Sequence, residues 1–236
     1  MVPVQDAMRL LFFIPIWRRP EITEICFMGI KRLQAQGVHE VIPFVVISEE
    51  EMKPLCEKYG VEYCFYKNSP LGEKKNYGIS QLLKKDFDYM VEIGSDDLLK
   101  NEFLTFYPWD KHVMGLNDFI IINSETGACR RLSSTVSSFG TGLAIRKDVI
   151  QKCGDLWHPD KNRGMDRSVC YTLAKNGFME HRFSRAEPLS IDIKSEVNIS
   201  KYSFTGTKYS IEKAFEGLSS EEIEAIKALQ HAEVEN

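Results

Sequence analysis

Hydrophobic residues follow two patterns of spacing in the first hundred positions of the chain. Strand-like runs, in which apolar residues are nearly continuous, alternate with segments in which apolar residues recur at helical spacing. Two of these helical segments end at Gly37 and Gly60, as helices commonly do. Nearly continuous apolar runs are typical of strands buried on both faces of a parallel sheet. The pattern therefore predicts an α/β sheet with strands over 9–16, 39–48, 61–68 and 88–97 and helices over 20–37, 49–60 and 73–86.

The regular alternation of strand-like and helical segments ends at about residue 100, and after it the two kinds of segment follow each other without a fixed order. The predicted elements are a hairpin over 118–134, a strand and a helix over 138–154, a helix over 165–178 and strands over 178–195. Ser219 and Glu222 form a capping box that opens a last helix, which packs on the body or pairs with a second copy in a homodimer. We expect one continuous domain with two halves, 1–100 and 101–236.

The composition narrows the class of protein. The chain has 236 residues, of which 43% are hydrophobic, and this is enough for a real core without structural metals or disulfides. Its net charge of −4 and the lack of a basic block argue against nucleic acid or an anionic membrane as a partner. Six scattered cysteines without zinc-ligand spacing indicate a reducing compartment. No apolar stretch approaches the roughly 20 residues of a membrane span, so we expect a cytoplasmic protein.

Polar clusters follow the predicted strands at the points where the strands end. They are Trp17-Arg18-Arg19, Ser48-Glu49, 68–76 and Ser95-Asp96-Asp97. Ligands of open parallel sheets bind at the carboxyl ends of the strands, so we expect these clusters to meet. Together they offer basic and polar side chains around one acidic position. A nucleoside diphosphate with a bridging hard cation requires this arrangement, with carboxylates for the metal and donors for the phosphates.

Five motifs, in order, resemble the glycosyltransferases of the GT-A fold, especially the family 2 type and its short bacterial or phage-borne relatives. The likeness covers Arg9 to about Lys194. The motifs are FFIPIWRRPE at 12–21, NSPLGEKKNYGI at 68–79, VEIGSDDLL at 91–99, GTGLAIRKDVI at 140–150 and NRGMDRSVCYTLAKNGF at 162–178.

The resemblance implies a GT-A type nucleotide-diphospho-sugar transferase fold, with a mostly parallel central sheet flanked by helices and a mixed C-terminal half. It implies a glycosyltransferase that moves a sugar from a nucleotide-sugar donor to an acceptor hydroxyl, assisted by Mn²⁺ or Mg²⁺ and with inversion. Asp166 would be the catalytic base, and Asp96 and Asp97 the metal ligands. The donor would be bound by Pro15, Trp17, Arg18, Ser48, Lys74, Lys75, Asn76 and Asp96, and the acceptor by Gly140, Gly142 and Trp157.

The sequence departs from the family pattern at three places. One is Ile47-Ser48-Glu49, which does not match the strand-end Asp residues of relatives. Gly94 stands where relatives usually carry an additional Asp of the acidic motif, and the late His ligand has no obvious equivalent. Asp192 and Lys194 lie near the place of that His and are candidate substitutes. A lysine in the first turn of a helix opposes the helix dipole, so we expect a bound anion near Lys74 or Lys75.

Structural roles compete with each functional one. Asp96 and Asp97 fit a solvated helix N-terminus, and Asp166 fits an N-cap. Arg18 and Arg19 fit surface charge. The remaining candidates fit structural roles as well: Trp17 as cover for the sheet end, Gly140 and Gly142 as turn residues and Trp157 as part of a surface loop.

Two other functions also remain. One is a catalytically inactive GT-A-like module that binds nucleotide sugars or a protein, which the absent acid at position 94 favours. The other is a sugar nucleotidylyltransferase. Such enzymes normally carry a glycine-rich phosphate loop after the first strand, and residues 12–21 contain no glycine.

Overall fold

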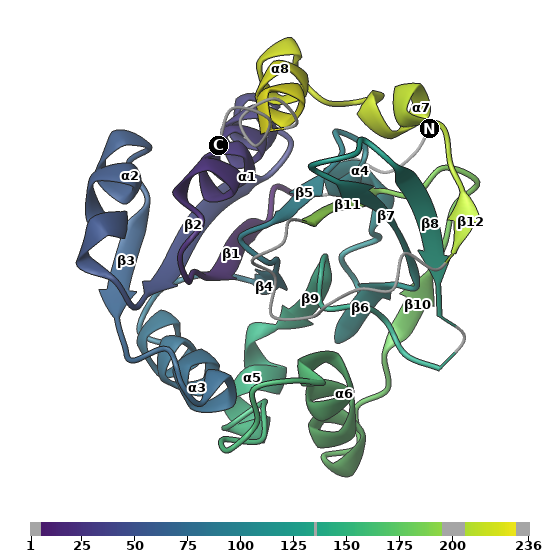
Figure 1. Ribbon diagram of the computed structural model, residues 1–236. Coiled ribbons are helices and arrows are strands. Elements are labelled where there is room, and N and C mark those ends of the chain that lie inside the picture. The colour runs from purple at the N-terminus through teal and green to yellow at the C-terminus, as the bar shows by residue number, and fades with distance from the viewer. Residues whose placement is uncertain (1–5, 135, 195–205, 230–236) are drawn as a thin grey trace.

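The computed structural model describes residues 6–134, 136–194 and 206–229 and contains a large and a small sheet (Figure 1). The large sheet has seven strands in the order β10-β6-β9-β4-β1-β2-β3. Four of its six strand pairs are parallel, and only β9 runs against both of its neighbours. The expected mostly parallel sheet is therefore confirmed. Its strands are β1 (Arg9–Pro15), β2 (Glu40–Ile47), β3 (Glu62–Phe65), β4 (Tyr89–Glu92), β6 (Val113–Leu116), β9 (Leu143–Arg146) and β10 (His181–Phe183).

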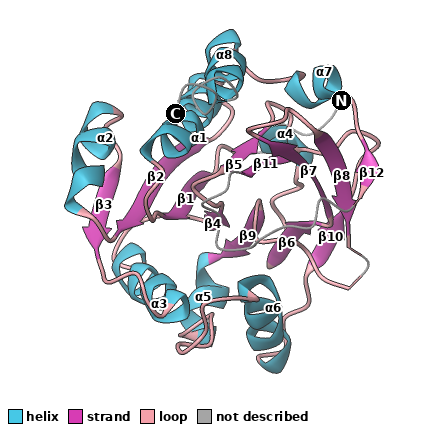
Figure 2. Ribbon diagram, in the orientation of Figure 1, coloured by secondary structure: helices cyan, strands magenta, loops and turns pink. Residues whose placement is uncertain are grey.

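Helices cover both faces of the large sheet, which explains why its strands are apolar throughout (Figure 2). Successive side chains of a strand point to opposite faces. Leu10, Phe12 and Ile14 of β1 accordingly pack with α1 (Pro20–Ala35) and α2 (Lys53–Lys58). Leu11 and Phe13 pack on the other face. The helices of that face are α3 (Leu71–Leu82), α5 (Lys147–Cys153) and α6 (Met165–Lys175).

The small sheet has the order β12-β8-β7-β11-β5 and brings distant segments together. Its strands are β5 (Asp97–Leu99), β7 (Asp118–Asn123), β8 (Cys129–Ser133), β11 (Ser190–Lys194) and β12 (Thr207–Lys208). β5 directly follows the end of β4 and pairs antiparallel with β11. A third apolar cluster joins this sheet to α1 and α8. The remaining helices are α4 (Phe103–Phe106), α7 (Ile211–Phe215) and α8 (Ser220–Leu229).

Most expected elements are present with shifted ends. The hairpin is formed by β7 and β8, and the capping box is formed by Ser219 and Glu222 at the start of α8. The sequence did not predict β5, β6, β12, α4 or α7. In particular Asp97 begins a strand, so the alternative of a solvated helix N-terminus is wrong. The end of the last predicted strand at residue 195 and the end of the last helix at 230–236 lie outside the described residues.

Candidate functional site

The four polar clusters lie at the carboxyl ends of β1 to β4, as the sequence predicts. The chain runs from β1 to β2 and β3 on one side, while β4 and β9 lie on the other, so the strand order reverses between β1 and β4. Ligands of open α/β sheets bind at such a switch point. The segments after these two strands touch there: Arg19 donates to Asp96 (Nη1–Oδ2, 3.0 Å) and to Ser95 (Nη2–Oγ, 3.3 Å).

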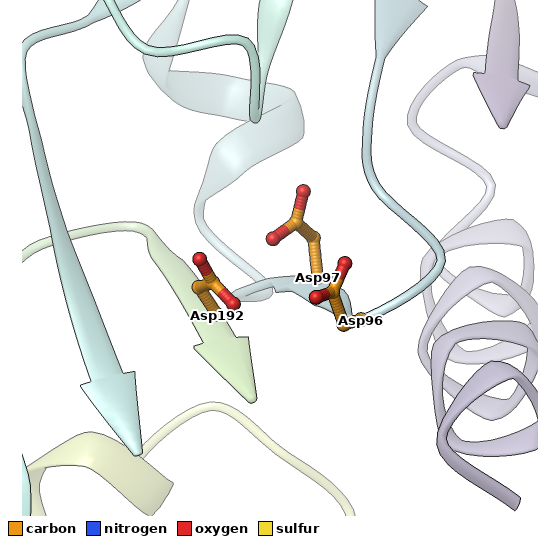
Figure 3. A group of neighbouring side chains, drawn as sticks. All are labelled: Asp96, Asp97 and Asp192. Carbon is orange, nitrogen blue, oxygen red and sulfur yellow. The ribbon is translucent and has the colours of Figure 1, made fainter. Parts of the chain in front are cut away.

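A third carboxylate joins Asp96 and Asp97 at this position. Asp192 of β11 pairs in register with Asp97 of β5, so their side chains are direct cross-strand neighbours. One carboxylate oxygen from each of the three aspartates lies within 4.8 Å of the others. Figure 3 shows Asp192 reaching from β11 toward the two acids of the segment that leads into β5. All three side chains are largely buried.

Two cations partly neutralise these carboxylates. Lys194 lies two residues beyond Asp192 on β11, and its Nζ contacts Asp192 Oδ2 at 2.6 Å and Asp96 Oδ2 at 3.6 Å. Arg19 contacts the same oxygen of Asp96 at 3.0 Å. Asp97 instead accepts hydrogen bonds from the backbone N–H of Gly94 and the hydroxyl of Thr141. Among the described residues in contact here, two formal positive charges thus face three formal negative charges.

The protonation of the aspartates reflects this imbalance. Burial, together with the neighbouring charge of Asp96, raises the pKa of Asp97 to about 7. Burial, opposed by Lys194, also raises the pKa of Asp192 well above its usual value. Burial alone would raise the pKa of Asp96, but Lys194 and Arg19 outweigh it and lower that pKa. The folded protein without a metal therefore disfavours full ionisation of the cluster.

The residues present fit a hard divalent cation. Such ions take carboxylate oxygens, and three are supplied here from two different strands and a turn. The Oδ1 atom of Asp192 is buried and has no hydrogen-bond partner among the residues that the structure describes. A buried hydrogen-bond acceptor without a partner lowers the stability of the fold, unless a bound ligand or ion interacts with it. A divalent cation would supply both that partner and the missing positive charge.

Crowding by Asp96 and Asp97 explains why residue 94 is a glycine and not the acid that relatives usually carry. A Cβ atom at residue 94 would lie 2.7 Å from Asp97 Oδ2 and 2.8 Å from Asp96 Oδ1. Any side chain at position 94 would therefore collide with both carboxylates. The third acid comes from Asp192 instead, so the departure from the family motif does not leave the cluster short of carboxylates.

The turn after β1 has a strained backbone. Arg18 and Arg19 both have positive φ angles, 55° and 58°, which non-glycine residues rarely adopt. Such strain concentrates at functional sites, where the surrounding structure holds it. Arg18 is exposed, and its guanidinium lies 4.7 Å from the ring centroid of Trp17, which is half-buried. Arg18 is thus an exposed cation that directly precedes Arg19, the residue that contacts the carboxylate cluster.

Asp166 lies at a second group of acids, near the start of α6. A Cβ atom added to Gly140 would lie 2.9 Å from Asp166 Oδ1 and 3.4 Å from Glu92 Oε1, so Gly140 leaves room for both carboxylates. The next residue, Thr141, donates to Asp97. The short segment 140–141 therefore connects the neighbourhood of Asp166 to the carboxylate cluster. Gly142 has a φ of +81° and donates its N–H to the Glu92 carbonyl at 2.8 Å.

Glu92 is a buried acid that the sequence analysis missed. It is 4% exposed and forms an ion pair with Lys75, whose Nζ also lies 4.6 Å from the ring centroid of Trp157. Burial raises the pKa of Glu92, Lys75 opposes this, and Asp166 adds to it. Glu92 stands inside a strand-like run, where the pattern alone gives no sign of a charged partner.

The anion expected at the start of the helix that carries Lys74 and Lys75 is not supported. α3 begins at Leu71, so both lysines lie beyond its first three residues. The N–H groups of that first turn are taken by the segment 159–162: Leu71 donates to Asn162 Oδ1, Gly72 to the Lys161 carbonyl and Glu73 to the Pro159 carbonyl. The helix end is capped by the protein itself, which removes the reason to expect an anion there.

The polar groups of three further candidates serve the fold. Lys74 is fully buried and donates to the Ile16 carbonyl and to Asn68, and burial lowers its pKa to about 8. Asn76 exchanges two hydrogen bonds with the backbone of Trp157, at 2.7 and 3.0 Å. Trp157 is only 1% exposed, so it does not form part of a surface loop. Lys74, Lys75 and Asn76 thus hold strand ends and loops in place.

Two further residues that were predicted to bind the nucleotide-sugar donor lie at the carboxyl ends of β1 and β2, as expected. Pro15 ends β1 beside Val46 of β2, and Ser48 follows β2. The Ser48 hydroxyl is buried and has no hydrogen-bond partner within the described part of the chain.

The buried ion pair gives a stability prediction. Replacing Lys75 by Met leaves Glu92 as a buried charge without a partner, and breaking such a pair costs about 3–5 kcal/mol. We expect K75M to lower the free energy of unfolding by that amount in urea titrations. The exposed Lys84→Met serves as the control. The double variant K75M/E92Q should lose less than K75M alone, and a loss below about 1 kcal/mol in K75M would contradict the prediction.

The described residues contain no helix both long enough and apolar enough to cross a membrane.

The strand order, the helices on both faces and the acidic turn at the switch point define a nucleotide-diphospho-sugar transferase type of fold. This confirms the fold that the sequence resemblance implies.

Solved structures share this fold. The S. aureus TarS 1–349 structure matches with a TM-score of 0.51 and 13% identity over 79% of this chain and 60% of that chain. A longer S. aureus TarS structure matches with a TM-score of 0.55 and 14% identity over 80% of this chain and 37% of that chain. TarS is a GT-A-type glycosyltransferase. The inositol-1-phosphate CTP transferase from T. maritima matches with a TM-score of 0.54 and 12% identity over 96% of this chain and 98% of that chain.

Identities this low show the fold alone, and the chain spans 60% and 37% of the two TarS chains. No protein-family model matches the sequence, and no curated protein matches it.

Proposed function

We propose that this protein is a metal-assisted glycosyltransferase that moves a sugar from a nucleotide-sugar donor to an acceptor hydroxyl with inversion. One observation carries the proposal: Asp96, Asp97 and Asp192 converge at the switch point of a nucleotide-diphospho-sugar transferase type of fold. A cytoplasmic location and a homodimer stay predictions.

The donor would lie over the turn after β1 and the carboxylate cluster. Asp96, Asp97 and Asp192 would hold Mn²⁺ or Mg²⁺, which when bound neutralises charge on the diphosphate leaving group. Arg18 is exposed and would pair with a phosphate oxygen, while the ring of Trp17 would contact the base. Pro15 and Ser48 would border the nucleotide.

Asp166 would act on the acceptor as the general base. Its carboxylate would take the proton of the acceptor hydroxyl while that oxygen forms a bond to the anomeric carbon. The bond from the anomeric carbon to the donor phosphate breaks at the same time, and the nucleoside diphosphate leaves with the electron pair. Gly140 carries no side chain beside Asp166, which leaves room for the acceptor to approach. Gly142 shapes the same segment.

The contacts of Lys74, Lys75, Asn76 and Trp157 lie within the protein and support a structural role beneath the site instead of ligand binding. These residues fix the end of β1, the start of α3 and the loop after α5.

A second candidate is nucleotidyl transfer. The T. maritima CTP transferase matches this chain over nearly the full length of both. Product analysis separates the two reactions. A glycosyltransferase releases a nucleoside diphosphate from a nucleotide sugar and an acceptor, whereas a nucleotidyltransferase releases pyrophosphate from a nucleoside triphosphate and a phosphorylated alcohol or sugar.

A thermal-shift panel tests the proposed donor site. We expect one of UDP-, GDP- or dTDP-sugars to raise the melting temperature, and to raise it more with Mn²⁺, because a ligand of the native state stabilises it by mass action. CTP and the other nucleoside triphosphates form the second arm. No shift with any nucleotide sugar, with or without Mn²⁺, would refute the donor site, and a shift with a triphosphate alone would favour the second candidate.

A further inference from the structure

A cavity whose lining includes none of the three clustered aspartates lies between α6 and the loop that follows α5. Its volume is about 650 Å³, and its walls include Tyr171 of α6 and Trp157 and Lys161 of the loop. Figure 1 shows α5 and α6 side by side at the edge of the molecule. The reaction proposed above assigns no role to this cavity.

The α6 wall combines positive charge with an aromatic ring. Arg167, Tyr171 and Lys175 all line the cavity and are spaced four residues apart, so they form one stripe along the helix. With a rise of 1.5 Å per residue the stripe is about 12 Å long. Tyr171 is 71% exposed, an unusual state for a large aromatic side chain of a helix that otherwise packs on the core.

The cations of the cavity are not balanced by protein acids. The side chains of Arg167, Lys175 and Lys161 form neither hydrogen bonds nor ion pairs with any residue that the structure describes. Asp155 is the one acidic residue that lines the cavity. Three unpaired cations therefore gather in one cavity of a protein whose net charge is −4.

The opposite wall is held in place before any ligand arrives. The Trp157 backbone is bonded to Asn76, and the N–H of the next residue, His158, donates to Ser168 Oγ at 2.8 Å. The indole Nε1 of Trp157 is buried and lacks a hydrogen-bond partner among the described residues. A preformed concave site with a few convergent polar groups is typical of small-molecule binding.

We infer that this cavity binds an anionic saccharide. One face of a pyranose ring consists of C–H groups and packs against an aromatic ring such as Tyr171. Carboxylate or phosphate groups on the sugar would pair with Arg167, Lys175 and Lys161, and Arg suits bidentate binding of either group. The length of the α6 stripe suits a ligand with more than one ring or more than one anionic group. The inference does not depend on the proposed transfer reaction.

Binding measurements without metal or nucleotide test the inference. The anionic probes are tetragalacturonate, which is carboxylated, and glucose 6-phosphate, which is phosphorylated; maltotetraose is the neutral probe and inorganic phosphate the bare anion. We expect saturable binding of at least one anionic saccharide by calorimetry, at least tenfold tighter than maltotetraose and inorganic phosphate. Saturation-transfer NMR should place the sugar ring protons against Tyr171.

Variants assign the binding to this cavity. R167Q/K175Q should weaken binding of the anionic saccharide at least tenfold, and Y171A should abolish the saturation transfer to the ring protons. Arg163→Gln is the matched control, because Arg163 is exposed and lies in the same segment but does not line the cavity. The inference is overturned if neither anionic saccharide binds, if R167Q/K175Q binds as the unchanged protein does, or if inorganic phosphate binds as tightly as the saccharide.

Discussion

Replacing Asp192 by Asn is expected to raise the melting temperature of the metal-free protein and to abolish its stabilisation by Mn²⁺. Asp192 faces Asp97 directly across two strands, and like charges in that position are destabilising. The variant removes one of these charges while keeping the shape of the side chain. It also removes the ion pair of Asp192 with Lys194, but Lys194 keeps Asp96 as a partner. The variant further removes a ligand of the proposed cation site, so the same substitution has opposite effects with and without metal.

The effect on metal binding should be large. At a Mn²⁺ concentration of about 100 times the dissociation constant, binding stabilises the folded state by about 2.7 kcal/mol. For a chain of this size that corresponds to a rise in melting temperature of about 5–10 °C. We expect this rise in the unchanged protein and in Asp160→Asn, an exposed control, and its loss in D192N. A D192N protein that is less stable without metal, with no Mn²⁺ effect in either protein, would show that the cluster is only a structural ion-pair network.

The pH dependence provides an independent check on the same pair. The pKa of Asp97 is raised from 3.8 to about 7, and that of Asp192 is raised as well. Between about pH 4 and pH 7 the folded metal-free protein therefore binds protons that the unfolded chain has released. Stability from these groups is full below about pH 4 and is lost as the pH rises through 7. The excess melting temperature of D192N over the unchanged protein should grow across this interval, and a constant difference would contradict the raised pKa values.

Replacing Asp166 by Asn should remove most of the sugar transfer while leaving donor binding intact. General-base catalysis contributes about 10²- to 10⁴-fold to a rate, and Asn cannot accept the acceptor proton. We expect D166N to release the nucleoside diphosphate that many times more slowly, with the donor that the thermal-shift panel identifies. Asp160→Asn is again the matched control.

The two parts of this prediction have separate readouts. The thermal shift with donor and Mn²⁺ should be the same in D166N and in the unchanged protein, because Asp166 belongs to the group at Gly140 and not to the carboxylate cluster. Retention of more than about a tenth of the turnover would exclude Asp166 as the base. Loss of the donor shift together with turnover would point to a structural role for Asp166.

Local sequence patterns predicted much of the fold, because the burial of apolar residues and the conformational preferences at helix ends depend on neighbouring residues. Continuous apolar runs identified the buried strands, and capping and glycine signals identified helix ends such as Gly37. The strand-end clusters followed from topology alone, since the carboxyl ends of parallel strands share one edge of a sheet.

The remaining features depend on contacts between distant segments. The pairing of Asp97 with Asp192 results from the register of β5 against β11, which no local pattern specifies. The start of α3 was misplaced because its first N–H groups are capped by the segment 159–162 and not by a neighbouring residue. The ion pair of Glu92 could not be predicted from the strand pattern, because its partner Lys75 lies on the helix α3.

The crowding around Gly94 also has a consequence for ancestry. A side chain at position 94 would crowd Asp96 and Asp97, while Asp192 supplies the third acid from a distant strand. We therefore expect homologues that keep all three aspartates to keep glycine at position 94 as well. The conserved unit would then consist of two short segments far apart in the sequence, and a search with either segment alone would miss it.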